Sequence, residues 1–417
     1  MLFFLIFIRK FISVDICSTI DMVDNSGMGA AKTGKKDEFY TQYHDIEAEM
    51  NAYIESDPDV FRGKTILLPC DDPEWSEFTR YFATNFERFG LKKLISTSYA
   101  KGAANKQTTL FEFNSPLYDR EKHDTHGKLF ILSRDVDNSG IIDVEDIEFT
   151  GYLKGDGDFN SKEVTKLRDE SDIIITNPPF SQFRQFIAWV MEGKKQFIIL
   201  ANINAVTYKE VFPYIKENKL WLGSSIHSGD REFRVPSDYP LNAASYRTDD
   251  DGNNYIRVKG VRWFTNIDYI GRHELLLLDT MEHNLKFNKS LRKKFVEEYG
   301  ALEYPVYDNF DAIDIPFTEC IPSDYDGIMG VPVTFMDKYN PDQFEILGCA
   351  DYTGKYGSDE LGISRIGEKW ISKYKEGGGK GHYTANMTSL VFYGGNGEAF
   401  PTFKRILIRP KKIGGNN

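Results

Sequence analysis

Short apolar segments alternate with amphipathic helical patterns from residue 64 onward, and this alternation constrains the fold more than any other feature of the chain. "KTILLPC" (64–70) is followed by the helical pattern "EWSEFTRYFATNFERFG" (74–90), where Gly90 is a stop signal, and then by "KKLISTSY" (92–99). A strand, a helix and a second strand at this spacing form a βαβ unit, which requires a parallel sheet. The sequence therefore predicts the α/β class.

The same pattern continues on both sides of this unit. An extended entry and a helix are expected over 37–56, because Ile46, Met50 and Tyr53 recur at helical spacing. The further strands are expected at 128–135, 147–153, 171–176, 195–201, 220–225, 261–268 and 273–279, and the further helices at 161–171, 180–193 and 207–219. Beyond about residue 280, prolines, glycines and short strands dominate. We therefore expect a domain at 36–280 and a second, loop-rich module at 281–417.

The first 35 residues differ from the rest. Their apolar run, Leu2 to Ile8, is far shorter than the ~20 residues of a membrane span. Basic residues follow this run, whereas a signal peptide places them before it. We expect a disordered leader or a mispredicted start, and no membrane association. The four cysteines, Cys17, Cys70, Cys320 and Cys349, form no CxxC pair, so no disulfide framework or metal site is predicted and a cytoplasmic location is the default.

Charge is unevenly distributed along the chain. The formal net charge of −12 argues mildly against a polyanionic partner. Between Lys355 and Lys412, however, 11 Lys and Arg stand against 5 Asp and Glu, a local charge of 11 − 5 = +6. This favours a basic C-terminal module beside an acidic body, although an ordinary solvated surface would give the same count.

The segment "SDIIITNPPF" (171–180) is the strongest functional signal. It carries an apolar strand directly into Asn177, Pro178, Pro179 and Phe180. Ligands of open parallel sheets bind at the carboxyl ends of strands. Asn177 offers a side-chain carbonyl, and Pro178 offers a main-chain carbonyl without a competing N–H. Two acceptors on rigid backbone can hold one exocyclic NH2 group, while Phe180 stacks on the ring that carries it. A strand that simply ends in a proline-rich turn is the structural alternative.

Such a clamp suits methylation of an aromatic amine. The lone pair of such an amine is delocalised into the ring and is a weak nucleophile. Acceptors on both N–H groups favour the pyramidal geometry in which this lone pair can attack, and they stabilise the positive charge that develops. The rigid prolines supply the alignment. This chemistry alone allows cytosine N4 as well as adenine N6.

Asn-Pro-Pro-Phe at this place resembles the fourth motif of S-adenosylmethionine-dependent amino-methyltransferases. The ordered set "DEFYTQYHDIEAEM", "CDDPEWSEFTRYFATNFERFGLKKLISTSY", "YLKGDGDF", "DIIITNPPF" and "YDGIMGVPVTFMDKYNPDQFEILG" is similar to the EcoRI-type adenine-specific DNA methyltransferases, from about residue 36 onward. The resemblance implies a Rossmann-like methyltransferase sheet and a C-terminal target-recognition module. It also implies methyl transfer from S-adenosylmethionine to a flipped adenine in double-stranded DNA. A restriction endonuclease would be the cognate partner, without a stable complex.

The resemblance also implies roles for individual residues. Asn177, Pro178, Pro179 and Phe180 would be the catalytic residues that hold the target base. The residues implied at the cofactor are Tyr40, Thr41, Cys70, Asp71, Asp72, Asp158 and Phe159. Tyr40 would lie near the sulfonium, with core packing as the alternative. Asp71 or Asp72 would bind the amino group or the ribose of the cofactor, or else would cap the following helix.

Asp158 and Phe159 would contact the cofactor's adenine. This chain departs from most methyltransferases because the acidic-x-Gly-x-Gly pattern is absent after the first strand, and no acidic ribose ligand is obvious in "ISTSYA" (95–100). Base readout is expected in loops around 325–345 and 375–405. Arg231 and Arg234 would line the DNA channel or would form surface salt bridges.

Three weaker signals compete with this interpretation. "DVDNSGIIDVED" (135–146) has the ligand offsets of a calcium loop, but its flanks are strand-like and it also reads as a turn between strands. His123 and His126 form a weak candidate metal pair in a polar loop. "GGGKGH" (377–382) is no phosphate loop, because Gly381 follows Lys380 where Ser or Thr is required.

Other functions remain open from the sequence. Asn-Pro-Pro-Phe or -Tyr also serves enzymes that methylate glutamine in protein or guanine N2 in RNA. A non-catalytic DNA-binding protein on a degenerate methyltransferase fold is the third possibility, because the first cofactor motif is weak.

Overall fold

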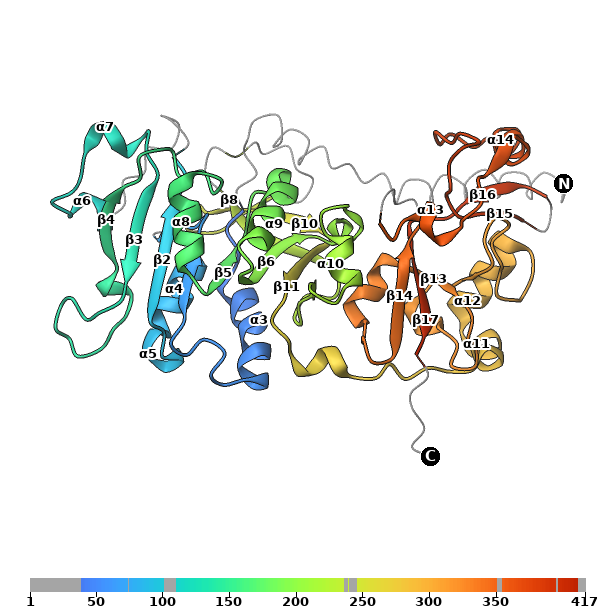
Figure 1. Ribbon diagram of the computed structural model, residues 1–417, viewed down its shortest axis with the longest axis horizontal. Coiled ribbons are helices and arrows are strands. Elements are labelled where there is room, and N and C mark those ends of the chain that lie inside the picture. The colour runs from blue at the N-terminus through green and yellow to red at the C-terminus, as the bar shows by residue number, and fades with distance from the viewer. Residues whose placement is uncertain are drawn as a thin grey trace.

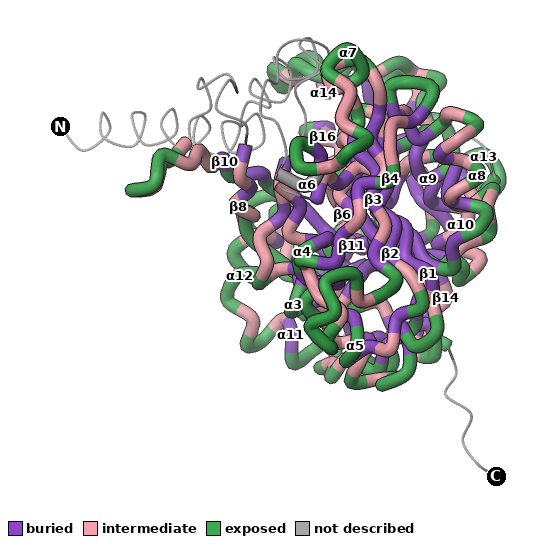
Figure 2. The backbone as a smooth tube through the Cα atoms, turned by 90° about the vertical axis from the view of Figure 1, so that its left-hand side faces the viewer, coloured by how far each residue is buried: buried purple, intermediate pink, exposed green. Residues whose placement is uncertain are grey.

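The computed structural model describes residues 39–411 apart from 74, 101–109, 236–238, 240–245, 351–354 and 395–396. The expected leader at 1–35 lies outside the described residues. Figure 1 shows a large sheet with its helices beside a smaller sheet-containing part that is formed by the C-terminal third of the chain. In Figure 2 the buried residues follow the strands and the exposed residues follow the outer helices and loops.

The large sheet has eight strands in the order β4-β3-β2-β1-β5-β6-β11-β7. Its strands are β1 (Thr65–Leu68), β2 (Lys93–Ser98), β3 (Lys128–Leu132), β4 (Glu148–Tyr152), β5 (Ile173–Thr176), β6 (Gln196–Asn202), β7 (Trp221–Leu222) and β11 (Val261–Thr265). Strands β2, β1, β5 and β6 run parallel, whereas β3 and β11 are antiparallel to their neighbours. The predicted α/β class is therefore confirmed, with a mixed sheet in place of a purely parallel one. The edge where β1, β2, β5 and β6 end is called the carboxyl edge below.

Most helices of this part lie where the sequence pattern predicted them, whereas the short helices at 110–113 and 120–123 fall in a polar segment that we expected to be a loop. They are α3 (Tyr43–Ser56), α4 (Glu77–Thr84), α5 (Phe86–Phe89), α6 (Leu110–Phe113), α7 (Arg120–His123), α8 (Lys162–Glu170), α9 (Phe183–Glu192) and α10 (Phe212–Lys216), with 3-10 turns at Val144–Asp146, Phe180–Gln182, Ile203–Thr207 and Ile270–His273. The helix predicted over 74–90 is divided at Asn85, and Gly90 ends it in the left-handed region at φ 62°. The helix predicted over 207–219 is shorter than expected and spans Phe212–Lys216.

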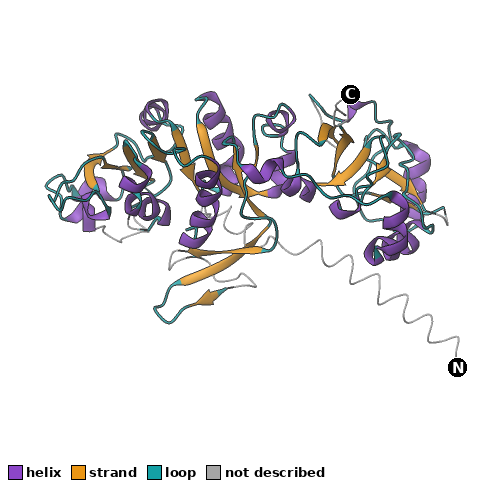
Figure 3. Cartoon of the chain, turned by 90° about the horizontal axis from the view of Figure 1, so that it is seen from below, coloured by secondary structure: helices purple, strands orange, loops and turns teal. Residues whose placement is uncertain are grey.

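A small antiparallel sheet, in the order β8-β10-β9, was not predicted. It consists of β8 (Asp230–Val235), β10 (Asn254–Lys259) and β9 (Arg247–Thr248), and Figure 3 shows these strands projecting from the body of the molecule. Phe233 and Ile256 are paired and buried, while charged residues alternate with them along both strands. This hairpin is amphipathic rather than apolar, which is why no continuous apolar run marked it.

The strand predicted at 273–279 is wrong. Residues 270–273 form a 3-10 turn, and the following residues are extended without a partner strand among the described residues. Gln343 takes the place of a partner: its Oε1 accepts from Leu276 N at 2.8 Å and its Nε2 donates to Leu276 O at 2.9 Å. Leu277 is 98% exposed, so the leucine run forms a linker along the surface.

The C-terminal part contains a four-stranded sheet in the order β12-β13-β17-β14 and a two-stranded hairpin. Its elements are β12 (Ile313–Asp314), β13 (Met329–Pro332), β14 (Phe344–Cys349), β15 (Val391–Tyr393), β16 (Ala399–Pro401), β17 (Arg405–Pro410), α11 (Met281–Phe287), α12 (Lys289–Lys294), a π-helical turn (Phe295–Tyr299), α13 (Ser358–Leu361), α14 (Gly367–Glu376) and 3-10 turns at Thr318–Cys320 and Val333–Lys338. This part is rich in loops, as expected. The boundary near residue 280 stays our proposal.

The two parts share one apolar cluster, because Val206 and Leu222 belong to the same set of packed side chains as Phe335 and Phe344. A buried ion pair crosses the junction: Arg262 Nε lies 2.6 Å from Asp337 Oδ1, and Arg262 Nη2 lies 2.9 Å from Asp337 Oδ2.

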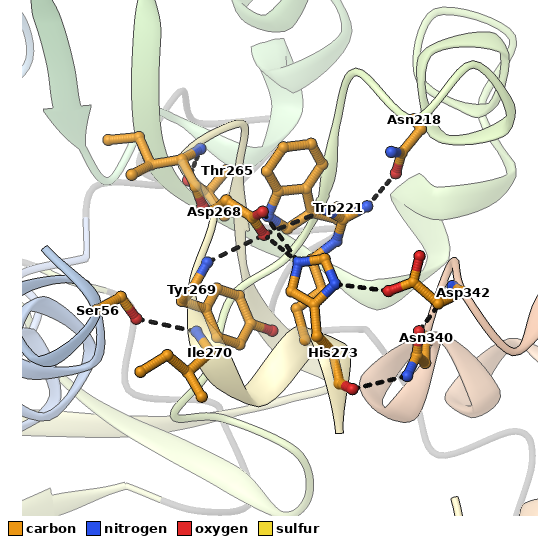
Figure 4. A network of polar contacts seen from close by, with 12 residues as sticks. Ser56, Asn218, Trp221, Thr265, Asp268, Tyr269, Ile270, His273, Asn340 and Asp342 are labelled. Atoms are coloured by element: carbon orange, nitrogen blue, oxygen red, sulfur yellow. Dashed lines mark hydrogen bonds and ion pairs between the residues drawn. The ribbon is translucent and has the colours of Figure 1, made fainter. Parts of the chain in front are cut away.

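A second polar contact lies where the linker begins (Figure 4). His273 stands between Asp268, at 2.9 Å, and Asp342 of the C-terminal part, also at 2.9 Å. Asn340 Nδ2 donates to the main-chain oxygen of His273 at 2.9 Å. The smaller part is therefore anchored to the larger one by polar contacts as well as by apolar packing.

Candidate active site at the carboxyl edge

Three predicted motifs meet at the carboxyl edge of the large sheet. Residues 69–72 follow β1, and residues 177–180 follow β5. The glycine-containing loop 153–158 follows β4. The end of β4 pairs with the start of β3, and the start of β3 pairs with the end of β2, so this loop also lies at the carboxyl edge. The chain places β2 to β4 on one side of β1, and β5 and β6 on the other. Such a switch in strand order creates the crevice in which open α/β sheets bind ligands.

Asn177 has a fixed side-chain orientation. Its Nδ2 donates to the main-chain oxygen of Phe39 at 2.6 Å. Its Oδ1 is buried and has no hydrogen-bond partner among the described residues. Because a buried polar atom without a partner costs free energy, this oxygen is the clearest sign of a ligand-binding group in the site. The amide therefore presents an acceptor whose direction is set by the Phe39 carbonyl.

The other residues of the tetrad form a rigid exit from β5. Pro178 is buried, and the Pro179 oxygen accepts from Gln182 N at 2.9 Å, which begins the turn into α9. Phe180 is half-buried, and its ring meets that of Phe39 edge-on, with centroids 5.6 Å apart. The structure thus brings the predicted catalytic tetrad together with the first described segment of the chain.

Residues 39–41 connect the tetrad to the β8–β10 hairpin. Tyr40 N donates to Arg234 O at 2.9 Å, and Arg234 N donates to Tyr40 O at 3.1 Å. Tyr40 is half-buried rather than enclosed, and Thr41 is 4% exposed. Thr41 Oγ1 is a second buried atom without a partner among the described residues. The predicted cofactor residues Tyr40 and Thr41 therefore lie beside the tetrad.

Asp71 connects the ends of two strands. Its Oδ2 accepts from Thr176 Oγ1 at 2.6 Å, and its Oδ1 accepts from Ser76 Oγ at 2.8 Å. Its main-chain oxygen accepts from Ser96 Oγ at 2.5 Å. Asp71 is buried, with 7% of its surface exposed. Asp71 thus holds the ends of β1 and β5 at a fixed separation.

Neither aspartate caps α4, so the capping alternative is wrong. Ser76 is the N-cap, and its Oγ accepts from Thr79 N at 3.3 Å. Asp72 contributes its main-chain oxygen to the turn, where it accepts from Ser76 N at 2.8 Å. Cys70 and Asp72 are half-buried at the end of β1. Their expected contacts with a cofactor stay predictions.

The loop "GDGDF" packs closely against the end of β2. Gly157 has φ +87°, and a Cβ there would lie 2.3 Å from the main-chain oxygen of Ser98, so only glycine fits. Asp158 is half-buried, and its Oδ1 accepts from Asn160 N at 2.7 Å. This places Asp158 at the carboxyl edge, as the motif requires.

Phe159 lies deeper than the resemblance implied. It is 4% exposed and packs edge-on against Phe186 and Trp189, with centroids 5.0 and 5.6 Å away. The Phe159 ring is therefore packed in the apolar core. Its contact with a cofactor ring stays a prediction.

Arg231 and Arg234 lie on β8 beside residue 40. Arg231 Nε is 3.6 Å from Asp45 Oδ1, so Arg231 forms a salt bridge, as the alternative prediction stated. The Arg234 guanidinium lies over the Trp75 ring, 5.2 Å from its centroid. Both contacts leave the proposed role in a DNA channel open.

The acidic loop at 135–146 does gather carboxylates. Ligand atoms of Asp135, Asp137 and Asp146 lie within 4.8 Å of one another. Burial tends to raise the pKa of Asp146, but main-chain N–H donors, among them Val136 N at 2.6 Å, bring it below its ordinary value. A strand precedes the loop, a 3-10 turn at Val144–Asp146 ends it, and a strand follows, so this described segment lacks the two helices of an EF-hand. Calcium binding stays an open prediction that titration calorimetry tests.

The two histidines do not converge on a common site. His123 Nδ1 lies 2.9 Å from Glu112, whereas His126 Nδ1 contacts Thr125 Oγ1 at 2.8 Å. Glu112 is fully buried and also binds Lys128 Nζ at 2.6 Å. No local pattern in the sequence marks this ionic cluster, because its members lie on separate turns of a polar segment and on β3.

The sequence patterns also did not lead us to predict the buried carboxylate of Glu49. It is fully buried on α3, where its carboxylate accepts from Ser224 N at 3.0 Å, Ser225 N at 2.7 Å and Tyr53 Oη at 2.6 Å. The sequence does contain an indication of this burial, because Glu49 lies on the same helical face as the apolar residues Ile46 and Tyr53. A carboxylate on an otherwise apolar face indicates a buried partner.

Comparison with known proteins agrees with this geometry. The family model described as adenine-specific methyltransferase EcoRI matches residues 27–411. The Type II methyltransferase M.EcoRI of Escherichia coli is 41% identical over 344 residues, which cover 82% of this chain and 94% of that protein. M.MpnI of Mycoplasma pneumoniae, also a Type II methyltransferase, is 32% identical over 325 residues, covering 76% and 84%. No solved structure matches the chain.

Two further findings bear on the predictions. None of the helices in the described part of the chain is both long enough and apolar enough to cross a bilayer. The large mixed sheet agrees with a methyltransferase fold, and the family match extends over both parts of the chain. This protein therefore belongs to the EcoRI family of adenine-specific methyltransferases, and it is an α/β enzyme of that family.

Proposed function

We propose that the active site of this DNA adenine methyltransferase lies at the carboxyl edge, between residues 39–41 and the tetrad 177–180. The observation that carries the proposal is the buried Asn177 Oδ1, which has no partner among the described residues although the other end of the same amide is firmly bound. An adenine that leaves the duplex would bring its N6 amine to this oxygen. Flipping is required because N6 cannot reach a methyl donor while the base is stacked.

The residues present fit S-adenosylmethionine, which when bound supplies an electrophilic methyl group. Thr41 Oγ1 offers a buried hydroxyl without a partner among the described residues, and Tyr40, the preceding residue, is half-buried. Cys70 and Asp72, after β1, and Asp158, in the loop after β4, would line the same crevice. Both oxygens of Asp71 are already engaged by Thr176 and Ser76, so we assign Asp71 the role of holding the site together.

The tetrad would act on the target base through hydrogen bonds and stacking. Asn177 Oδ1 and the Pro178 carbonyl would accept the two N–H bonds of the amine, which localises its lone pair for attack. Phe180 would lie on the face of the base. The bond from Asn177 Nδ2 to the Phe39 carbonyl fixes the acceptor before the base arrives, so little reorganisation is needed during the reaction. The proton of the methylated amine would pass to solvent.

Recognition of the DNA sequence would belong to the C-terminal part. Its local charge of +6 between residues 355 and 412 suits contacts to phosphates. Loops around 325–345 and 375–405 are our candidates for base readout. We also propose a cytoplasmic location and a restriction–modification context, with a companion endonuclease that forms no stable complex with this protein.

A methylation assay with labelled S-adenosylmethionine tests the proposal. Plasmid DNA should take up label at adenine N6, whereas purified ribosomal RNA and protein substrates should not. Long-read sequencing of host DNA with and without the gene would report the methylated base and its sequence context together. Label in cytosine, in RNA or in glutamine would contradict the proposed substrate, and cofactor binding without any methyl transfer would contradict catalysis.

A further inference from the structure

Glu112 is a fully buried carboxylate that the proposed reaction does not use. It lies on α6, in the segment between β2 and β3, and Figure 1 shows α6 and α7 beside β3 and β4 at the left end of the large sheet. Three groups from other elements converge on it: His123 Nδ1 at 2.9 Å, Lys128 Nζ at 2.6 Å and the Tyr152 hydroxyl. Burial tends to raise the pKa of this carboxyl, but hydrogen bonds with Lys128, Tyr152 and His123 bring it below its ordinary value.

Both oxygens of Glu112 are occupied. Oε1 accepts from the Tyr152 hydroxyl and Oε2 from Lys128 Nζ, while His123 Nδ1 lies 2.9 Å from each of the two oxygens. Because the side chain has no exposed surface and its oxygens already have donors, it does not offer a contact to a ligand. Any effect of Glu112 on the reaction must therefore pass through the residues that it binds.

Two of these residues adjoin the loop 153–158, which carries the predicted cofactor residue Asp158. Tyr152 is the last residue of β4 and directly precedes the loop. Lys128 is the first residue of β3 and directly follows Gly127, on which the loop packs. The same carboxylate therefore joins the strand that the loop leaves to the strand on which the loop rests.

The contact between Gly127 and this loop is made by main-chain atoms. The N–H of Gly127 donates to Gly155 O at 2.9 Å, and its oxygen accepts from Leu153 N at 2.8 Å. A Cβ on Gly127 would lie 2.5 Å from the Cα of Gly157, so the two main chains touch directly. A shift of the start of β3 would therefore move the loop with it.

We propose that Glu112 is a positioning residue for binding of the adenosine half of S-adenosylmethionine. This inference rests on the proposed function, in which Asp158 lies at the cofactor. Through Lys128 and Tyr152, the carboxylate holds the loop in the place from which Asp158 meets the cofactor's adenine. The tetrad 177–180 follows β5, and β2 and β1 lie between β3 and β5. Methyl transfer by the loaded enzyme should therefore not depend on Glu112.

The test measures cofactor binding and methyl transfer separately. Glu112→Gln keeps the shape of the side chain and removes the charge that Lys128 pairs with. It is expected to raise the dissociation constant of S-adenosylmethionine in titration calorimetry roughly 5- to 150-fold, the range typical for loss of one partner of a buried hydrogen bond. The dissociation constant of methylthioadenosine, which lacks the amino-acid part of the cofactor, should rise by the same factor. The single-turnover methylation rate on plasmid DNA at saturating cofactor should stay within about twofold of the wild-type rate, as for a change in binding alone.

Asp314→Asn is the matched control. Asp314 is also fully buried, and its Oδ1 accepts from Arg405 Nε at 2.7 Å and from Tyr307 Oη at 2.5 Å. It lies on β12 of the C-terminal part, away from the loop 153–158 in the sheet order. The control should lower the melting temperature and leave both dissociation constants at their wild-type values.

Tyr152→Phe is a milder variant, because it removes one hydroxyl group and keeps the ring. It should weaken binding of both ligands, and it decides the question if Glu112→Gln does not fold. Unchanged dissociation constants, weaker binding of S-adenosylmethionine but not of methylthioadenosine, or an equal effect of Asp314→Asn would overturn the positioning role. Absence of S-adenosylmethionine binding by the wild-type protein would instead count against the proposed function.

Discussion

Substitution of Asn177 by Asp distinguishes the contribution of the amide oxygen from that of the amide nitrogen. Aspartate keeps an acceptor for the target amine, and a carboxylate is a stronger acceptor than an amide oxygen. It removes the Nδ2 donor, however, and sets an oxygen against the Phe39 carbonyl, where the structure has a 2.6 Å hydrogen bond. If the Phe39 carbonyl orients the side chain, Asn177→Asp must lose activity in spite of its better acceptor.

The expected magnitude follows from that one contact. Removal of one partner of a buried hydrogen bond costs about 1–3 kcal/mol. If this cost falls on the aligned state of the site, it corresponds to a roughly 5- to 150-fold decrease in rate at 1.36 kcal/mol for each tenfold change. Asn177→Ala removes the acceptor as well, and loss of a preorganised hydrogen-bonding group costs about 10²- to 10³-fold. Methylation activity should therefore decrease from the wild-type Asn177 to Asn177→Asp and then to Asn177→Ala.

Single-turnover methylation of a cognate duplex under saturating enzyme and cofactor measures this order. Calorimetric titration of S-adenosylmethionine should give dissociation constants for both variants within about tenfold of the wild-type value, since a single neutral hydrogen bond contributes about 1 kcal/mol. An Asn177→Asp enzyme as fast as the wild type would refute the argument, because the Phe39 carbonyl would then have no part in orienting residue 177.

Three further predictions follow from other parts of the molecule. Arg262→Ala leaves Asp337 buried without its cation and should lower the free energy of unfolding by about 3–5 kcal/mol in denaturant titration, whereas an unchanged midpoint would contradict anchoring by this pair. Gly157→Ala places a Cβ 2.3 Å from the Ser98 oxygen and should weaken S-adenosylmethionine binding in calorimetry, with wild-type affinity as the contrary result. His273 lies between two carboxylates, whose hydrogen bonds and charge raise its pKa above the ordinary 6.5. Its stabilising contribution should be complete below about pH 6.5 and lost as pH rises through the raised pKa, so melting temperatures of the wild type and His273→Gln should converge toward alkaline pH.

The sequence predicted the centre of the fold because apolar strands and helical periodicity are local signals. Ile173–Thr176 is buried along its whole length, and its apolar run predicted that correctly. The same reasoning failed for the leucines at 275–278, because an apolar run alone does not separate a strand from a linker that covers a core. What decided that segment was Gln343, 67 residues away, and a contact at such separation leaves no local pattern.

The site was predictable to a similar extent. The motifs predicted that the tetrad 177–180 and residues 40–41 belong to one site, and the structure places residue 39 in contact with Asn177 and Phe180; their roles stay predictions. The role of Asp71 could not be predicted, because its carboxylate is bound by Thr176, which is 105 residues away. The buried carboxylate of Glu49 follows the same rule, since the main-chain donors that bind it come from a loop more than 170 residues later. Side chains that join distant strand ends take their meaning from the topology of the sheet.

In the site that we propose, residues 39–41 would couple the cofactor side to the target side. This short segment belongs to no helix, and outside contacts fix its position: the Phe39 oxygen binds Asn177, Tyr40 pairs with Arg234, and the Phe39 ring packs on Phe180. The segment carries the predicted cofactor residues, and its Phe39 oxygen orients the amide that we propose binds the target. Occupation of one side should therefore order the acceptors of the other, because both depend on the same few main-chain bonds. That arrangement favours binding of S-adenosylmethionine before the adenine is committed to the pocket.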